Sequence, residues 1–125
     1  MEAGLTDDPV ENLRLFVTEV ARTGLVWGLR DEDGWAILDS MVREGDDVMP
    51  FWSTEQYAFD AATDEWVEYE VAEVELSTFV DTFLSKMEQE GCLVGPNWPG
   101  SDAGLEIDAA DLAAAIGAAI GALET

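Results

Sequence analysis

The sequence contains no histidine, a single cysteine and a single lysine among its 125 residues. Without histidine the chain lacks the most common general base, the Ser-His and Cys-His nucleophile pairs, and the usual ligand of zinc sites. Cys92 has no partner for an intrachain disulfide, and its place after Gly91 in an apolar segment is typical of a buried structural thiol rather than a reactive one. These absences predict a protein that is not an enzyme and that needs no metal or cofactor.

Carboxylates are the one catalytic group in good supply, because the chain has 28 aspartate and glutamate residues. A glycoside hydrolase needs only two of them, so a carboxylate-based enzyme stays open as an alternative. Asp31, Asp33 and Gly34 resemble a fragment of a calcium loop, but Leu29 and Ser40 stand where further ligands would be required. We interpret that segment as a hairpin turn.

Basic residues are scarce, with 5 lysines and arginines and a formal net charge of −23. Such a surface repels phosphate groups, so we expect binding to neither nucleic acid nor anionic lipid. The acidity has three interpretations: adaptation to concentrated salt, docking on a basic partner, or compositional drift. The acidic residues are spread along the whole chain and lysine is nearly absent, which favours adaptation to salt.

Long apolar runs are also missing. The segment 109–123 is too short to span a bilayer, and Asp108, Asp111 and Glu124 bracket or interrupt it. The N-terminal residues have no basic region followed by an apolar stretch, so no signal peptide is indicated. We therefore expect a cytoplasmic protein that does not bind membranes.

The composition suits one domain, because 48% of the residues are hydrophobic and the length is typical of a single core. We predict one domain over residues 1–125, with a core of about 9–124 and flexible residues 1–7. In the first half, Asp8 and Gly24 bracket a predicted helix 9–23. Two β-prone runs, 25–30 and 35–39, flank an acidic turn and predict a hairpin.

The rest of the chain continues this mixed pattern. Val48–Trp52 is a predicted strand in which Pro50 indicates an edge or an interruption. Ser53 and Ser77 are the predicted caps of helices 54–62 and 78–90. The remaining predictions are alternating strand 67–71, strands 92–95 and 105–107, and helix 109–123, capped by Asp108. The fold class is α+β: a small, largely antiparallel sheet packed by about four helices in the order α-β-β-β-α-β-α-β-(β)-α.

Four short motifs carry a resemblance to a known family. They are Val26-Trp27-Gly28-Leu29, Asp33-Gly34-Trp35-Ala36, Met49-Pro50-Phe51-Trp52 and Leu93-Val94-Gly95-Pro96. In this order they resemble domain-of-unknown-function family 2750, over about residues 10–123. The resemblance implies a compact bacterial or archaeal α+β domain that usually stands alone, and it names no catalytic residue.

Tryptophans are the candidate binding residues. Trp27 and Trp35 lie on opposite arms of the hairpin, where cross-strand neighbours can meet. Trp52 precedes the second helix near Glu55, and Trp98 lies in a loop between prolines. An aromatic cluster beside Glu55 could hold a small ligand or a peptide. The alternative is that Trp27, Trp35 and the fifth tryptophan, Trp66, are plain core.

Gly117 and Gly121 stand four residues apart on the last predicted helix, a spacing that allows another backbone to approach closely. Either the helix packs tightly on the sheet there or the two glycines form a dimer contact, so both a monomer and a homodimer remain open.

The sequence thus predicts a non-enzymatic binding or interaction module whose partner is a protein or a small ligand. An immunity-like or inhibitor-like protein that masks a basic partner is the second hypothesis, and a carboxylate-based enzyme is the third.

Overall fold

The structure, a computed structural model, describes residues 5–6, 8–63, 66–99 and 104–123. Most of segment 1–7, which was predicted to be flexible, lies outside these ranges, as does residue 124 at the predicted end of the core. The elements follow an α+β order, with two small sheets of three strands each in the described part of the chain.

The first helix, α1 (Pro9–Thr23), has the predicted bounds. The Asp8 side chain accepts a hydrogen bond from the Val10 N–H, and Gly24 ends the helix with φ 77° while its N–H donates to the Val20 carbonyl. An acidic cap at the start and a left-handed glycine at the end satisfy backbone groups that the helix itself leaves open. These two local signals are why the sequence predicted this helix correctly.

The first sheet has the order β2-β1-β5 and is antiparallel throughout. Its strands are β1 (Leu25–Asp31), β2 (Gly34–Trp35) and β5 (Glu70–Glu75). The predicted hairpin is confirmed, but its second arm is much shorter than 35–39. The chain leaves β1 after Ala36, whose N–H still donates to the Leu29 carbonyl, and then enters the other sheet.

The second sheet has the order β3-β4-β6, and β4 and β6 run parallel. Its strands are β3 (Leu38–Asp39), β4 (Asp47–Phe51) and β6 (Leu93–Pro96). Pro50 predicted an edge or an interruption, but β4 is the central strand of this sheet. However, β3 pairs only with Asp47 and Val48, so Pro50 lies where β4 has a single strand neighbour and its missing N–H is tolerated.

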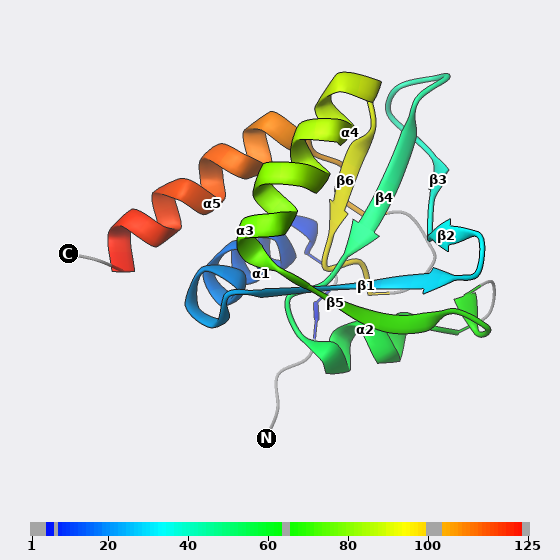
Figure 1. The fold of residues 1–125 in the computed structure, drawn as a ribbon, viewed down its shortest axis with the longest axis horizontal. Helices are drawn as coiled ribbons and strands as arrows, with labels where there is room; N and C mark the ends of the chain where they lie inside the picture. The colour runs from blue at the N-terminus through cyan, green and yellow to red at the C-terminus, as the bar shows by residue number, and fades with distance from the viewer. Residues whose placement is uncertain (1–4, 7, 64–65, 100–103, 124–125) are drawn as a thin grey trace.

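Two tryptophans join the sheets. Trp27 in β1 and Trp52, just after β4, exchange backbone hydrogen bonds of 2.8 and 2.7 Å. In Figure 1, β1 and β5 run across the picture and meet the steep strands β4 and β6 at this crossing. A smaller link replaces the predicted strand 105–107: Ile107 forms one isolated bridge with Val94.

The predicted strand 67–71 is also displaced. Val67 is 65% exposed, and the Tyr69 N–H donates to the carbonyl of buried Trp66, so the chain turns here before β5 begins at Glu70. The alternation of apolar and acidic residues predicted a strand with one buried face. Both faces of β5 are instead covered in part, since Val71 pairs with Leu29 and Val74 pairs with Val26 on the opposite face.

The remaining helices differ from the prediction mainly at their starts. Helix α2 (Glu55–Ala61) is capped by Thr54, which accepts from the Tyr57 N–H, rather than by Ser53. The third helix begins at Leu76 instead of 78, and Ser77 lies inside it. It consists of α3 (Leu76–Thr78), a π-helical segment η2 (Phe79–Leu84) and α4 (Ser85–Glu90). The last helix, α5 (Ala109–Leu123), has the predicted bounds.

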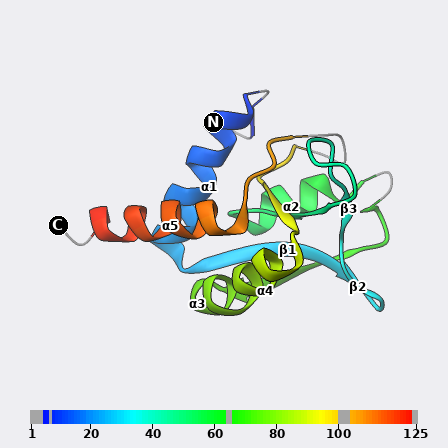
Figure 2. The ribbon, with the colours of Figure 1, turned by 90° about the horizontal axis from the view of Figure 1, so that it is seen from above.

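Helices cover the first sheet on both faces. Figure 2 shows α2 and the α3–α4 helix on opposite sides of β1, with α1 and α5 crossing at one end. Each side has its own apolar core: one around Phe16, Phe51 and Phe79, the other around Trp52, Trp66 and Trp98. Among the described helices, none is both long and apolar enough to cross a membrane.

Candidate functional site

The predicted pair of Trp27 and Trp35 is separated by strand β1. Trp35 lies opposite Arg30 in the β1–β2 register, so its side chain is on the face of Val26 and Gly28. Side chains alternate along a strand, which places Trp27 on the other face, in the core under α2. The prediction that these two rings are neighbours is therefore wrong.

Trp52 and Trp98 do meet, but away from solvent. Their exposed fractions are 0% and 2%, and the Trp52 indole N–H donates to the Trp98 carbonyl at 2.7 Å. Glu55 is exposed at the first residue of α2. The five residues predicted to form a binding surface thus lie in three different environments, and only Trp27 and Trp35 are partly exposed.

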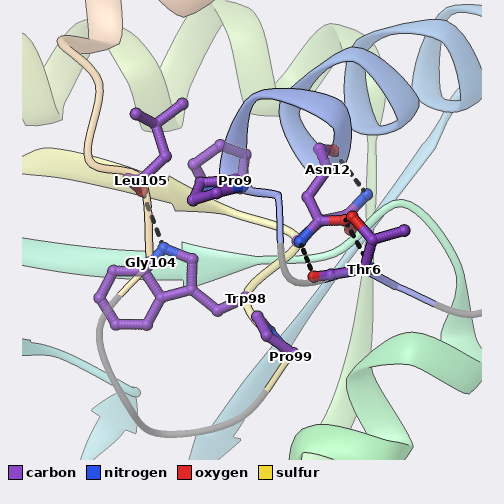
Figure 3. Close-up of a pocket in the computed structure, with 9 residues that line it drawn as sticks. Thr6, Pro9, Asn12, Trp98, Pro99, Gly104 and Leu105 are labelled. Carbon is purple, nitrogen blue, oxygen red and sulfur yellow. Dashed lines mark hydrogen bonds between the residues drawn. The ribbon is translucent and has the colours of Figure 1, made fainter.

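The loop around Trp98 encloses a small cavity of about 40 Å³. Figure 3 shows the Trp98 indole nitrogen directed at the Leu105 carbonyl, 2.8 Å away, and Thr6 joined to Asn12 by hydrogen bonds. Gly95 and Gly104 hold the ring closely: a Cβ on either would lie within 2.6 Å of it. A space of this size admits a few waters at about 10–15 Å³ each, but not an organic ligand. We interpret it as part of the packing.

Asn97 is the centre of a buried polar joint next to this cavity. Its side chain accepts from the Ser53 N–H at 2.9 Å and donates to the Asn12 carbonyl at 3.2 Å, so it ties β6 to α1 and to the start of α2. The residue is fully buried, with φ 52°. Ser53 donates to Glu19 at 2.6 Å. No buried side-chain nitrogen or oxygen in the described residues lacks a partner, so the joint is structural rather than an open site.

A larger groove lies between the α3–α4 helix and the strands β2 and β4. Its volume is about 360 Å³, within the usual range of roughly 300–1,000 Å³ for small-molecule sites. Met49 and Met87 supply flexible apolar surface, and Met87 is only 4% exposed. The groove is lined by Trp35, Met49, Thr82, Phe83, Lys86, Met87 and Glu90.

Packed aromatic rings form the floor of this groove. The ring of Trp35 makes an edge contact with Phe83, with ring centres 5.4 Å apart, and a tilted contact with Phe51 at 6.0 Å. The Arg30 guanidinium lies over Trp35, 5.5 Å from the ring centre. Offset and edge-on ring contacts of this kind are favourable, so the floor is held in place before any ligand arrives.

The π-helical segment η2 forms one wall. Its buried residues Phe79 and Leu84 point into the core, whereas Thr82 is exposed at the groove. Phe79 and Phe83 both pack on Phe51, with ring centres 4.9 and 6.0 Å apart. Short π-helical turns inside α-helices are uncommon and frequently mark functional sites. Here the turn aligns a helix wall with the aromatic floor.

Two opposite charges stand on the rim. Lys86 and Glu90 are one helical turn apart on α4, and both line the groove. The ion pairs among the described residues involve Arg14 and Arg43 only, so Lys86 is bonded neither to Glu90 nor to another described carboxylate. The only lysine of a chain with 28 acidic residues thus stands beside an apolar groove without a described carboxylate as its partner.

Sequence reasoning missed most of this groove. Of its lining, only Trp35 was a candidate, because Phe83 and Met87 follow the helical spacing that is typical of a core-facing stripe. The one signal in the sequence was that Lys86 is its only lysine, and this alone did not place Lys86 beside a groove.

Cys92 is buried, as predicted. Burial, together with the nearby carboxylates of Asp47, Glu90 and Asp46, raises the pKa of its thiol to about 11. The thiol is therefore protonated at neutral pH and is a poor nucleophile or metal ligand. No group of three or more metal-binding side chains was found in the described ranges.

Gly117 and Gly121 are exposed on α5, and a Cβ built on either would meet nothing within 4 Å. The interpretation that these glycines allow tight packing on the sheet is therefore wrong. Both figures show α5 extending beyond the sheets toward the C-terminus. A dimer contact at these residues stays a prediction.

Comparison with known proteins gives a family but no activity. The model of a family described as "Protein of unknown function (DUF2750)" matches residues 13–116, most of the chain. The match covers both sheets and ends within α5. No curated protein and no solved structure matches the chain.

Proposed function

Because the chain belongs to the DUF2750 family, whose description assigns no activity, we propose from its structure that it is a non-enzymatic binding module and that the groove beside η2 is its binding site. The observation that carries the proposal is the coincidence of an aromatic floor, a π-helical wall and a lysine without a described carboxylate partner in one groove of about 360 Å³. An apolar cleft with a few convergent polar groups is the usual form of a small-ligand site.

Two other recesses are weaker candidates for the binding site. The cavity at Trp98 is too small, and the shallow acidic recess around Arg30, Glu68 and Glu70 has no aromatic floor. Catalysis would need reactive groups beside the groove. Its only carboxylate is Glu90, and Cys92 is buried and protonated. A role in binding requires nothing beyond the groove itself.

The proposal is tested with indole, a neutral aromatic probe, followed by amide chemical shifts in solution. We expect saturable shifts that are confined to the groove, including the indole N–H of Trp35 and the amides of Met49 and Phe83. Thr82→Trp places a large ring at the groove and should weaken binding by about tenfold or more. Asp81→Trp is the matched control, because Asp81 is exposed on the same helix but does not line the groove. Shifts that never saturate, or that scatter over the surface, would overturn the proposal.

We also propose that the acidic surface is an adaptation to concentrated salt. With 5 basic residues, at most a fraction of the 28 carboxylates can be paired, and the rest repel one another. Exposed acidic side chains are distributed over helices, strands and loops, among them Glu32, Glu44, Glu68 and Glu88. The spread of these residues over several elements supports a relation to a saline solvent more than to one basic partner.

A further inference from the structure

We infer that the ligand of the groove is a small zwitterion with an apolar or aromatic side chain, of the size and charge pattern of a free amino acid. This inference rests on the proposed binding function and adds the chemical class of the ligand. It follows from the placement of Lys86 and Glu90 on the rim above the aromatic floor.

The rim offers one cation and one anion at a fixed spacing. Residues four apart on a helix are neighbours, about 5–6 Å between their Cβ atoms, so the two side chains reach the same side of the groove. Neither is consumed by an ion pair with the other. A ligand that carries a carboxylate and an ammonium group can bind Lys86 with the first and Glu90 with the second. Hydrogen bonds between charged groups are stronger than neutral ones.

The floor selects the rest of the ligand. Trp35 and Phe83 meet edge to face, and Met49 and Met87 complete an apolar surface with no further charged lining group. An aromatic or branched aliphatic side chain fits this surface. The volume of about 360 Å³ lies near the lower end of ligand sites, which favours a small ligand.

Long-range electrostatics favours a ligand without net charge. A protein with net charge −23 repels an anion before it reaches Lys86, although salt limits the range of this repulsion to about 8 Å in physiological buffer. A cation is attracted by the protein as a whole but is opposed by Lys86 at the groove. A zwitterion avoids both penalties and uses both rim charges.

A simpler role for Lys86 is to cover apolar surface with its aliphatic stem while its charge stays in water. That role involves neither a ligand carboxylate nor Glu90. The two explanations therefore differ in how binding responds to the charge of the ligand and to the removal of each rim charge.

The experiment compares three probes that share a phenyl ring: L-phenylalanine, 3-phenylpropionate without the ammonium group, and 2-phenylethylamine without the carboxylate. Titrations are followed by groove amide shifts in the wild-type chain. We expect L-phenylalanine to bind about tenfold more tightly than either analogue. Lys86→Gln should remove most of this advantage over 2-phenylethylamine, and Glu90→Gln should remove most of the advantage over 3-phenylpropionate.

The matched control is Glu88→Gln, which removes one negative charge from the same helix at an exposed residue that does not line the groove. It should leave the ranking of the probes unchanged. The exchanged variant Lys86→Glu with Glu90→Lys keeps both charges and should retain the preference for L-phenylalanine.

The outcomes separate this inference from the function on which it rests. Three results would overturn the inference that the ligand is a zwitterion but leave the groove as a binding site. They are equal affinity for the three probes, a preference for either singly charged analogue, and saturable indole binding with no binding of L-phenylalanine. If neither indole nor L-phenylalanine binds in the groove, both proposals fail.

Discussion

The ring of Trp35 lies against the backbone of Gly28, so closely that a Cβ on Gly28 would be 2.8 Å from it. The same Cβ would be 3.0 Å from the ring of Phe51. Glycine at this position in β1 therefore makes room for the indole that forms the floor of the groove. The stability of the first sheet and the shape of the candidate site depend on one absent side chain.

Gly28→Ala is expected to destabilise the protein by about 1–3 kcal/mol, because the added methyl forces Trp35 or Phe51 out of its packed position. The free energy of unfolding in urea measures this loss, and indole affinity should fall with it. Gly117→Ala is the control: its Cβ meets nothing within 4 Å, so we expect a gain of about 0.5–1 kcal/mol from helix propensity. Equal effects of the two substitutions would contradict this account of Gly28.

Asn97→Ala should cost about 1–3 kcal/mol, since it leaves the buried Ser53 N–H and Asn12 carbonyl without their side-chain partner. Asn97→Gly loses the same bonds but relieves the backbone at φ 52°. The glycine variant should therefore be more stable than the alanine variant, by up to about 1 kcal/mol. Urea unfolding of the three proteins gives the comparison. A wild-type stability for Asn97→Ala would show that the joint is dispensable.

Thermal stability should increase with KCl. Between about 0.1 M and 1 M salt the screening length falls from about 10 Å to 3 Å, which weakens repulsion among unpaired carboxylates. We expect the melting temperature to rise by at least about 5 °C, or roughly 1 kcal/mol for a domain of this size. The control changes exposed Glu68, Glu70 and Glu73 to glutamine, which should reduce the salt dependence. A melting temperature that does not change with salt would contradict the proposed adaptation.

The Cys92 thiol, with its pKa raised to about 11, should react slowly with a thiol reagent at pH 8 and rapidly once the chain is unfolded. The raised pKa also makes the free energy of unfolding depend on pH. The unfolded thiol ionises near its ordinary value of 9.0 while the folded one keeps its proton, so this contribution is present below pH 9 and is lost as pH rises toward 11. The difference in unfolding free energy between wild type and Cys92→Ala, measured from pH 7 to 11, isolates it. Rapid labelling of the folded protein at pH 8 would contradict the burial.

Local signals explain which parts of the fold were predictable. Asp8 and Gly24 bracket α1, and the Glu32-Asp33 turn sets the hairpin, because each signal acts within a few residues. The division of 34–39 between two sheets is not local. It depends on β4 and on the crossing of Trp27 with Trp52, which are 25 residues apart.

The candidate site was less predictable than the fold for the same reason. Trp35 was a candidate from its residue type alone, but the groove needs Gly28 beneath it, Met49 from β4 and Phe83 from the π-helical segment. Nothing in the sequence around Phe79–Leu84 indicates a π-helix rather than an α-helix. Lys86 gains its interest only when the strands are seen beside it.

The two backbone hydrogen bonds between Trp27 and Trp52 have a consequence for cooperativity. They connect β1, the central strand of the first sheet, to the residue that follows β4, the central strand of the second, and both residues belong to the core beneath α2. Neither sheet can therefore open without exposing backbone groups of its neighbour. The two halves should melt as a single unit, so tryptophan fluorescence and backbone circular dichroism should report one common transition rather than two.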